Sequence, residues 1–216
     1  MKSLSHNIKR FLFSEKCCIC NKILKEDGYI CRACLFKLKG MSFLKKEKDI
    51  YFFYYYEDIK NLIWDFKFNN RRGLSEQLAT LFGDSLKNLI KELEIDIVVP
   101  VPVSKERYKE RGFNQVEEFL NSLDIKFQKI ERIKNTRHMY EIDKKEEREK
   151  NLQSAFSSKI YLRGKKILLV DDIVTTGATL NAIREEIKNL CPKEIYIFSI
   201  SVVKSYFKKN HNDEVK

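Results

Sequence analysis

One stretch of the chain, residues 166–190, constrains the possible folds more than any other. The largely apolar segment Lys166–Val170 precedes Asp171 and Asp172, a turn of small residues follows, and an amphipathic helix is expected over Thr179–Leu190. A buried strand that leads through a short turn into a helix is the repeating unit of α/β proteins. Polar groups at the carboxyl end of such a strand lie where these folds collect ligands. The stretch therefore predicts an α/β fold with both carboxylates at a binding edge.

After residue 49, strands and helices continue to alternate. The expected strands are Ile50–Tyr56, Ile95–Val99, Ile125–Ile133, Lys166–Val170 and Glu194–Val203; the expected helices are Ile59–Phe68, Leu74–Leu93 and Ser104–Leu123, the last interrupted at Arg111-Gly112. The aromatic run Tyr51–Tyr56 fits a core strand better than a surface that stacks bases, because alternate strand residues point to opposite faces. The pattern predicts a mostly parallel sheet.

Residues 134–154 form a long polar connection between two expected strands. Long polar loops in compact domains are usually either functional lids or disordered segments, and we interpret this one as a lid over a bound ligand. A short exposed helix through Lys144–Lys150 is compatible with that interpretation.

Five of the six cysteines lie between positions 17 and 34. Cys17 and Cys20 form one CxxC pair and Cys31 and Cys34 another, a spacing that turns four thiolates toward one tetrahedral Zn²⁺. A unit of about 40 residues needs such a metal to fold, since it buries too little apolar surface alone. A redox dithiol is the competing interpretation of a CxxC pair.

Two further cysteines are left outside the metal site. Cys18 would pair with Cys20 only as Cys-x-Cys, which is poorer geometry for a metal knuckle. Cys191 precedes a proline at the end of the last helix and is expected to be a small buried apolar residue.

Positive charge is concentrated at the start of the chain. Residues 1–50 carry 12 Lys/Arg against 5 Asp/Glu, and residues 51–216 carry 30 against 26, so the net charge of +11 divides into +7 and +4. Clustered cations favour an anionic partner such as nucleic acid, although a solvated lysine-rich surface explains the same excess. No run approaches the ~20 apolar residues of a membrane span, and no signal-peptide pattern is present, so a cytoplasmic protein is expected.

The residues around Asp171 suit a ribose phosphate. Vicinal ribose hydroxyls can donate to Asp171 and Asp172, while backbone N–H groups of Thr175–Thr179 can surround a phosphate. Gly177 permits close approach of the backbone. Considered by themselves, two acids before Thr and Gly also fit an ordinary turn with a helix cap.

The ordered string Val170–Thr179, VDDIVTTGAT, resembles the phosphoribosyl-pyrophosphate (PRPP) motif of type I phosphoribosyltransferases. Further similarities lie in Val99–Pro102, in Arg111–Gln115 (RGFNQ), in Arg148 with Asn151, and in Ala155-Phe156. With the four-cysteine unit, they make nearly the whole chain resemble the ComF/GntX family.

The resemblance implies a type I phosphoribosyltransferase-like α/β domain with a mostly parallel sheet and a zinc-ribbon-like N-terminal domain. The implied divisions are residues 1–40 for the zinc segment, 41–49 for a linker, 50–207 for the transferase-like domain and 208–216 for a polar tail. It assigns the catalytic positions Asp171 and Asp172 to the ribose hydroxyls, and it assigns the 5′-phosphate to Thr175, Thr176, Gly177, Ala178 and Thr179.

The remaining implied site residues lie on the pyrophosphate side of the ligand. Val101 corresponds to the pyrophosphate loop, and Arg111, Asn114 and Gln115 match the family string; Arg111 is either an anion clamp or a residue that fixes the loop. The implied metals are structural Zn²⁺, held by Cys17, Cys20, Cys31 and Cys34, and Mg²⁺ bound with PRPP. The segment after Thr136, Arg137–Tyr140, departs from the family pattern at the expected lid.

Two functions follow from the resemblance. One is a PRPP-binding protein of natural competence that contacts single-stranded DNA and works with uptake machinery at the inner membrane. The alternative is an active phosphoribosyltransferase of base salvage without DNA contact. The sequence leaves catalysis open because it places no acceptor base and no general base beside the motif. A purely structural adaptor is disfavoured by the intact Asp171, Asp172 and phosphate loop.

Overall fold

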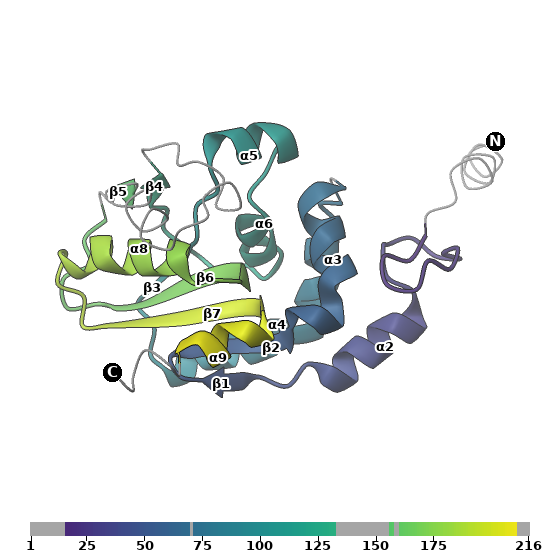
Figure 1. The fold of residues 1–216 in the computed structure, drawn as a ribbon, viewed down its shortest axis with the longest axis horizontal. Coiled ribbons are helices and arrows are strands. Elements are labelled where there is room, and N and C mark those ends of the chain that lie inside the picture. Colours follow the sequence, from purple (N-terminus) through teal and green to yellow (C-terminus); the bar gives the residue numbers. More distant parts are fainter. Residues whose placement is uncertain (1–15, 70, 133–155, 158–159, 211–216) are drawn as a thin grey trace.

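The computed structural model describes residues 16–69, 71–132, 156–157 and 160–210. Its centre is a five-stranded sheet with the strand order β1-β2-β7-β6-β3 (Figure 1). All neighbouring strands pair in parallel except β1 and β2, which are antiparallel. The strands are β1 (Lys45–Glu47), β2 (Ile50–Tyr55), β3 (Ile97–Pro100), β6 (Lys166–Val174) and β7 (Glu194–Val202). The expected α/β class with a mostly parallel sheet is confirmed.

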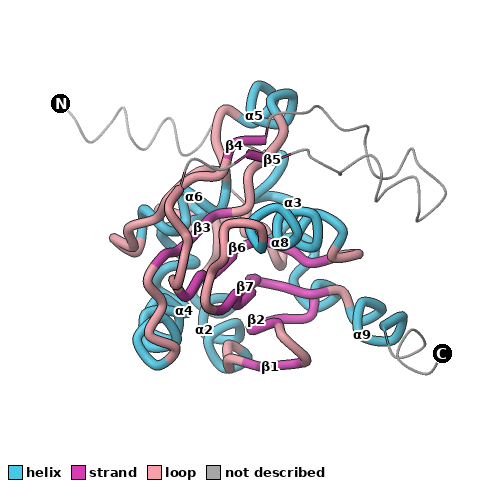
Figure 2. Tube along the Cα trace, turned by 90° about the vertical axis from the view of Figure 1, so that its left-hand side faces the viewer, coloured by secondary structure: helices cyan, strands magenta, loops and turns pink. Residues whose placement is uncertain are grey.

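Helices cover both faces of this sheet. The helices of the described residues are α2 (Arg32–Met41), α3 (Tyr56–Phe68), α4 (Leu74–Glu92), α5 (Lys105–Arg111), α6 (Gln115–Ser122), α8 (Ala178–Lys188) and α9 (Lys204–Asn210). A two-stranded antiparallel sheet, β4 (Glu131–Arg132) with β5 (Phe156–Ser157), lies near α8 (Figure 2). None of the described helices combines the length and the apolar character that crossing a membrane requires.

Alternate residues of β6 enter two separate apolar cores. Leu168 and Val170 pack in the core that contains α3, α4 and α6, whereas Ile167 and Leu169 pack with α8. Because successive strand residues point to opposite faces, the two cores lie on opposite sides of the sheet, as the positions of α4 and α8 in Figures 1 and 2 show. Apolar cores therefore pack against β6 on both faces of the sheet.

The cysteine-bearing segment packs against the α/β core. Ile30 and Leu38 are buried in the same core as residues of α3 and α4. The side-chain Oε1 of Gln77 on α4 accepts hydrogen bonds from the backbone N–H groups of Tyr29 (2.8 Å) and Ile30 (3.1 Å). Residues 41–49, expected as a linker, contain β1, which adds an edge to the sheet. The N-terminal segment therefore contacts the α/β core through both apolar and polar groups.

Two local expectations are wrong. Of the strand expected over Ile125–Ile133, only Glu131–Arg132 is a strand in the described residues. Ile125 and Phe127 pack against the core and alternate with exposed Lys126 and Gln128, but the segment is not a strand of the sheet, which ends at β3, and Gln128 N–H donates to the Val98 carbonyl (2.9 Å). Cys191 is exposed, because α8 ends at Lys188 and the chain turns with φ 52° at Cys191.

Candidate functional sites

The carboxyl end of β6 extends beyond its neighbour β3. The last β3 pair is Pro100 with Val170, and one more hydrogen bond, from Val101 N–H to the Val170 carbonyl (2.8 Å), follows before the chain leaves the sheet. Strand β6 continues to Val174, and among the described strands its partner there is β7 alone. The sequence had suggested that Asp171 and Asp172 follow the strand. In the structure they lie within β6. The departure of β3 opens the space beside them.

A pocket of about 410 Å³ occupies this space. It brings together residues expected to bind ribose, phosphate and pyrophosphate, namely Asp171, Asp172, Thr175, Thr176, Thr179, Val101, Arg111, Asn114 and Gln115. Gly177 and Ala178 line a smaller adjoining hollow, which shares Asp171 and the threonines. The expected lid, residues 134–154, lies outside the described residues, as do all three histidines.

The two carboxylates have different surroundings. Asp172 is buried, and its Oδ1 lies 2.7 Å from Nζ of Lys67 on α3. Asp171 accepts a hydrogen bond from the backbone N–H of Asp172 (2.9 Å). Burial, together with the negative charge of Asp172, raises the pKa of Asp171 to about 7, against the opposing effects of Lys67 and the Asp172 N–H. A cation or hydroxyl donors beside Asp171 would favour its ionised form.

The turn after β6 presents backbone N–H groups at the start of α8. Gly177 caps the helix in the left-handed conformation (φ 73°), and its carbonyl accepts from Asn181 N–H at 2.8 Å. A side chain at Gly177 would also collide with Tyr206, because an added Cβ would lie 2.7 Å from the ring atom Cε2. Thr175 and Thr176 are exposed at the pocket. The helix dipole and the backbone N–H groups of this turn suit a phosphate.

The RGFNQ string shapes the opposite wall. Gly112 ends α5 with φ 76°, and Asn114 caps α6 by accepting from Val116 N–H (3.0 Å). The Asn114 amide also donates to the Val101 carbonyl (3.1 Å), which ties the loop after β3 to α6. Asn114 therefore positions the Val101 loop, and its role in the described structure is architectural.

Arg111 and Gln115 leave donors unused at the pocket. Both side chains are buried, and Arg111 Nη1 donates to Gln115 Oε1 at 3.1 Å. Among the described residues, the buried side-chain atoms without a hydrogen-bond partner are Arg111 Nε and Gln115 Nε2. Unpaired buried donors cost about 1–3 kcal/mol each, so an anionic ligand toward which these side chains reorient would lower that cost. Burial also lowers the pKa of the Arg111 guanidinium from its usual value.

Two cations of the pocket were not identified from the sequence. Lys67 and Arg107 both line it. A signal for Lys67 was present, since it follows Ile59 and Ile63 at four-residue spacing on the buried stripe of α3, where a cation requires a partner. Arg107, in the first turn of α5, carries no comparable signal.

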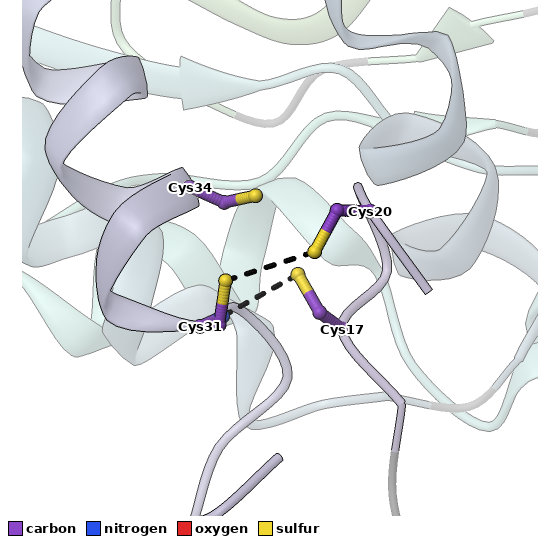
Figure 3. Close-up of side chains that lie close together, drawn as sticks. All are labelled: Cys17, Cys20, Cys31 and Cys34. Atoms are coloured by element: carbon purple, nitrogen blue, oxygen red, sulfur yellow. Dashed lines mark hydrogen bonds between the residues drawn. The ribbon is translucent and has the colours of Figure 1, made fainter. Parts of the chain in front are cut away.

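The four expected metal ligands converge. The sulfur atoms of Cys17, Cys20, Cys31 and Cys34 lie within 4.8 Å of one another (Figure 3). The Sγ atoms of Cys20 and Cys31 are 3.8 Å apart, and Sγ of Cys17 accepts from Cys31 N–H at 3.4 Å. Zn–S bonds of about 2.3 Å in a tetrahedron place sulfurs about 3.8 Å apart. Four converging sulfurs form a group able to hold a metal ion such as zinc.

Cys18 belongs to a different environment. It is buried beside this group, and burial raises the pKa of its thiol to about 12, with a further contribution from Cys17. By contrast, burial raises the pKa of Cys17, but donors from Cys31, Cys20 and Ile19 outweigh it, and the pKa falls to about 7. Cys18 is therefore a thiol packed in the core, outside the group of four sulfurs.

Known proteins are similar to this chain in both domain type and sequence. A family model described as "Phosphoribosyl transferase domain" matches residues 87–213. Competence protein F of Haemophilus influenzae is 30% identical over 68% of this chain and 69% of its own length. Competence protein ComFC of Streptococcus pneumoniae is 30% identical over 68% of this chain and 65% of its own length.

More distant similarities were also found. DNA utilization protein YhgH of Escherichia coli is 27% identical over 61% of each chain. The solved structure of adenine phosphoribosyltransferase from Saccharomyces cerevisiae is 18% identical, covers 64% of this chain and 73% of its own, and has a TM-score of 0.40. From the matched domain and the competence-protein relatives, we conclude that this chain belongs to the ComF family of proteins with a phosphoribosyltransferase domain.

Proposed function

We propose that the chain binds PRPP together with Mg²⁺ at the carboxyl end of β6 and serves DNA uptake. The observation that carries this proposal is the pocket itself. Its floor has the Asp171–Asp172 carboxylates, one end has the phosphate-binding turn, and the facing wall has the unused donors of Arg111 and Gln115. A ribose with phosphate groups at both ends matches this order of acceptors and donors.

Each part of PRPP has a partner in this arrangement. Asp171 and Asp172 accept hydrogen bonds from the ribose hydroxyls, Thr175–Thr179 surround the 5′-phosphate, and Arg111 with Lys67 faces the pyrophosphate. Carboxylate oxygens are the ligands that Mg²⁺ prefers, and the raised pKa of Asp171 marks a position where a cation is favourable. When bound, Mg²⁺ would neutralise pyrophosphate charge.

The same groups support transfer of the phosphoribosyl group as a second candidate function. In that reaction the bond between C1′ and the pyrophosphate oxygen breaks, its electron pair leaves with pyrophosphate, and an acceptor forms the new bond to C1′. Arg111 and Lys67 would stabilise the departing negative charge. The carboxylate pair, positioned for the hydroxyls, would hold the ribose as positive charge develops on it.

For DNA, we propose that the N-terminal basic segment contacts phosphates. Lys22, Lys25, Lys37 and Lys39 are all exposed, as a contact of this kind requires. The names of the relatives, which refer to competence and DNA utilization, support a role in handling incoming DNA. A partnership with uptake machinery at the inner membrane is part of the proposal.

Two titrations of the full chain test the proposal. Calorimetry should show PRPP binding that requires Mg²⁺, and a pyrophosphate-release assay with candidate bases then decides between binding and turnover. Anisotropy of labelled single-stranded DNA should show binding that weakens steeply with salt, as counterion release requires. Changing Lys22, Lys25, Lys37 and Lys39 to Gln should flatten the salt slope by up to about 0.7 per lost phosphate contact. The matched control changes four exposed lysines elsewhere, Lys87, Lys91, Lys188 and Lys193.

The outcomes separate the parts of the proposal. If no PRPP binding is detected, PRPP is not the ligand of this pocket. DNA binding that the first lysine variant retains in full rejects the N-terminal contact. Release of pyrophosphate with a base, without any DNA binding, would favour the base-salvage alternative.

A further inference from the structure

Helix α3 exposes an aromatic pair that the core does not use. The rings of Trp64 and Phe68 lie one helical turn apart, with centroids separated by 4.4 Å, and are 57% and 52% exposed. The buried face of the same helix is already supplied by Ile59, Leu62, Ile63 and Phe66. Two large adjacent apolar side chains on a solvent-exposed face indicate a binding surface more strongly than a single one does.

This pair adjoins the pocket. The guanidinium carbon of Arg111, a residue of the pocket wall, lies 4.9 Å from the centre of the Phe68 ring. Lys67 precedes Phe68 in the helix and extends its ammonium to Asp172. A continuous series of contacts therefore leads from the carboxylates of the pocket to Trp64 at the surface.

The charges around the pair are mainly positive. Lys60 is exposed one turn before Trp64, and Arg107 and Arg111 lie on the pocket side, where Lys67 is paired with Asp172. The nearest acid on the helix, Asp65, is paired with Arg71 at 2.8 Å and is 14% exposed. Glu57 and Asp58 lie at the first turn of the helix, about two turns from Trp64.

Aromatic rings between cations are what single-stranded nucleic acid requires. Bases stack on the rings in a sequence-tolerant manner, and the cations follow the backbone. We propose that Trp64 and Phe68 stack bases of single-stranded DNA beside the PRPP pocket. This inference rests on the proposed function and places base contacts on α3, in addition to phosphate contacts on the N-terminal segment.

The chain supplies its own probe, because Trp64 is its one tryptophan. Stacking of bases on Trp64 should quench its fluorescence when oligothymidine of about 15 nucleotides is added. An abasic deoxyribose-phosphate strand of equal length and charge should leave the fluorescence unchanged. Free thymidine monophosphate, at the same nucleotide concentration, should quench far less.

Variants measure the contribution of each ring by anisotropy of the labelled strand. Trp64→Ala and Phe68→Ala should each weaken oligothymidine binding about 5- to 150-fold, whereas Trp64→Phe should retain most of it. Tyr161→Ala, which removes a 72% exposed ring outside α3, is the matched control and should bind as the parent does. Trp64→Ala should keep the PRPP affinity and the melting temperature of the parent.

Each other outcome overturns the inference in a distinguishable way. If the parent binds PRPP and oligothymidine, and both alanine variants bind oligothymidine as tightly as the parent does, the stacking surface is wrong and the proposed function stands. Equal quenching by the abasic strand assigns the contact to phosphates. Quenching by the mononucleotide alone assigns the rings to a free base. A parent that binds no oligothymidine rejects this inference together with the DNA part of the proposed function.

Discussion

Nζ of Lys67 on α3 lies 2.7 Å from Oδ1 of Asp172 on β6, and both side chains are largely buried, with 17% and 8% of their surfaces exposed. The ion pair joins the helix that borders the pocket to the strand that carries its carboxylates. Lys67 also lowers the pKa of Asp171, in opposition to burial and to the charge of Asp172. The same lysine therefore interacts with both acids of the pocket.

Removing this lysine should be costly. Lys67→Met leaves Asp172 buried without its partner and should lower the free energy of unfolding by about 3 kcal/mol. Asp172→Asn should cost less, and the double variant should recover part of the loss. Urea unfolding of the four proteins gives the coupling energy, expected at about 1–3 kcal/mol. Strictly additive effects would show that the pair does not interact.

The raised pKa of Asp171 predicts an unusual pH dependence of stability. Its folded pKa of about 7 exceeds the ordinary value of 3.8, so the folded chain binds more protons than the unfolded chain between these values. The contribution of Asp171 is therefore favourable at low pH and is lost as pH rises toward 7. Asp171→Asn should stabilise the ligand-free chain at pH 8 by about 1 kcal/mol or more. An equal loss of stability at pH 5 and pH 8 would contradict the assignment.

PRPP should reverse this trend, because ribose hydroxyls donate to the ionised carboxylate. Affinity should fall about tenfold from pH 8 to pH 6 through Asp171, and binding near pH 7 should release a proton. Calorimetry in two buffers with different ionisation enthalpies measures that release. The 5′-phosphate also titrates near pH 6, so the pH dependence that remains in Asp171→Asn provides the correction.

The turn before α8, which we propose binds the 5′-phosphate, should tolerate no side chain at Gly177. Gly177→Ala requires alanine in the left-handed conformation and pushes Cβ against Tyr206. It should therefore lower the free energy of unfolding by about 1–2 kcal/mol and weaken PRPP binding. Adding Tyr206→Ala should relieve the collision but not the backbone strain. Thermal melts of both variants check this, and a fully stable Gly177→Ala variant would mean that the turn has another conformation.

The metal centre should require four cysteines and not the fifth. Cys31→Ser with Cys34→Ser should abolish bound zinc, whereas Cys18→Ser should keep one Zn²⁺ per chain, because Cys18 is a core thiol outside the sulfur group. Metal analysis of the purified proteins decides this. Full zinc content in the double serine variant would contradict the site.

The consequences of metal loss should extend beyond the cysteine segment. A separable zinc unit would leave the α/β domain intact on losing its metal. However, Ile30 and Leu38 pack in the main core, and Gln77 bonds the backbone of residues 29–30. Chelation should therefore also lower the melting temperature of the α/β part, as near-ultraviolet circular dichroism would show.

The sequence predicted the elements whose side chains follow a clear period. Strands β2, β6 and β7 and helices α3, α4 and α8 lie within a few residues of their expected bounds, because each buries a regular apolar face. The extension of β6 through Asp171 was not predicted from the sequence, because aspartate has an unfavourable strand propensity and pairing with β7 outweighs it there. Likewise, α9 lies in a polar stretch that has little periodicity.

The candidate sites divide in a similar manner. The four cysteines could be named from their spacing, and Asp172 and Gly177 from the resemblance of their segment to the PRPP motif. Lys67 reaches Asp172 from 105 positions away in the chain, and only the packing of α3 on the sheet brings the two together. The Trp64–Phe68 surface was hidden for the opposite reason, since an aromatic pair in an amphipathic helix reads as part of its core face.

The central claim, that Asp171 and Asp172 bind the ribose of PRPP, is tested most directly by calorimetry of the parent, Asp171→Asn and Asp172→Asn with PRPP and Mg²⁺. Each carboxylate-to-hydroxyl bond is charge-assisted and contributes about 1.5–3 kcal/mol, so each variant should bind about 10- to 150-fold more weakly. The parent should show no binding when Mg²⁺ is removed by chelation. Unchanged affinity in both variants, or no binding by the parent, would contradict the account.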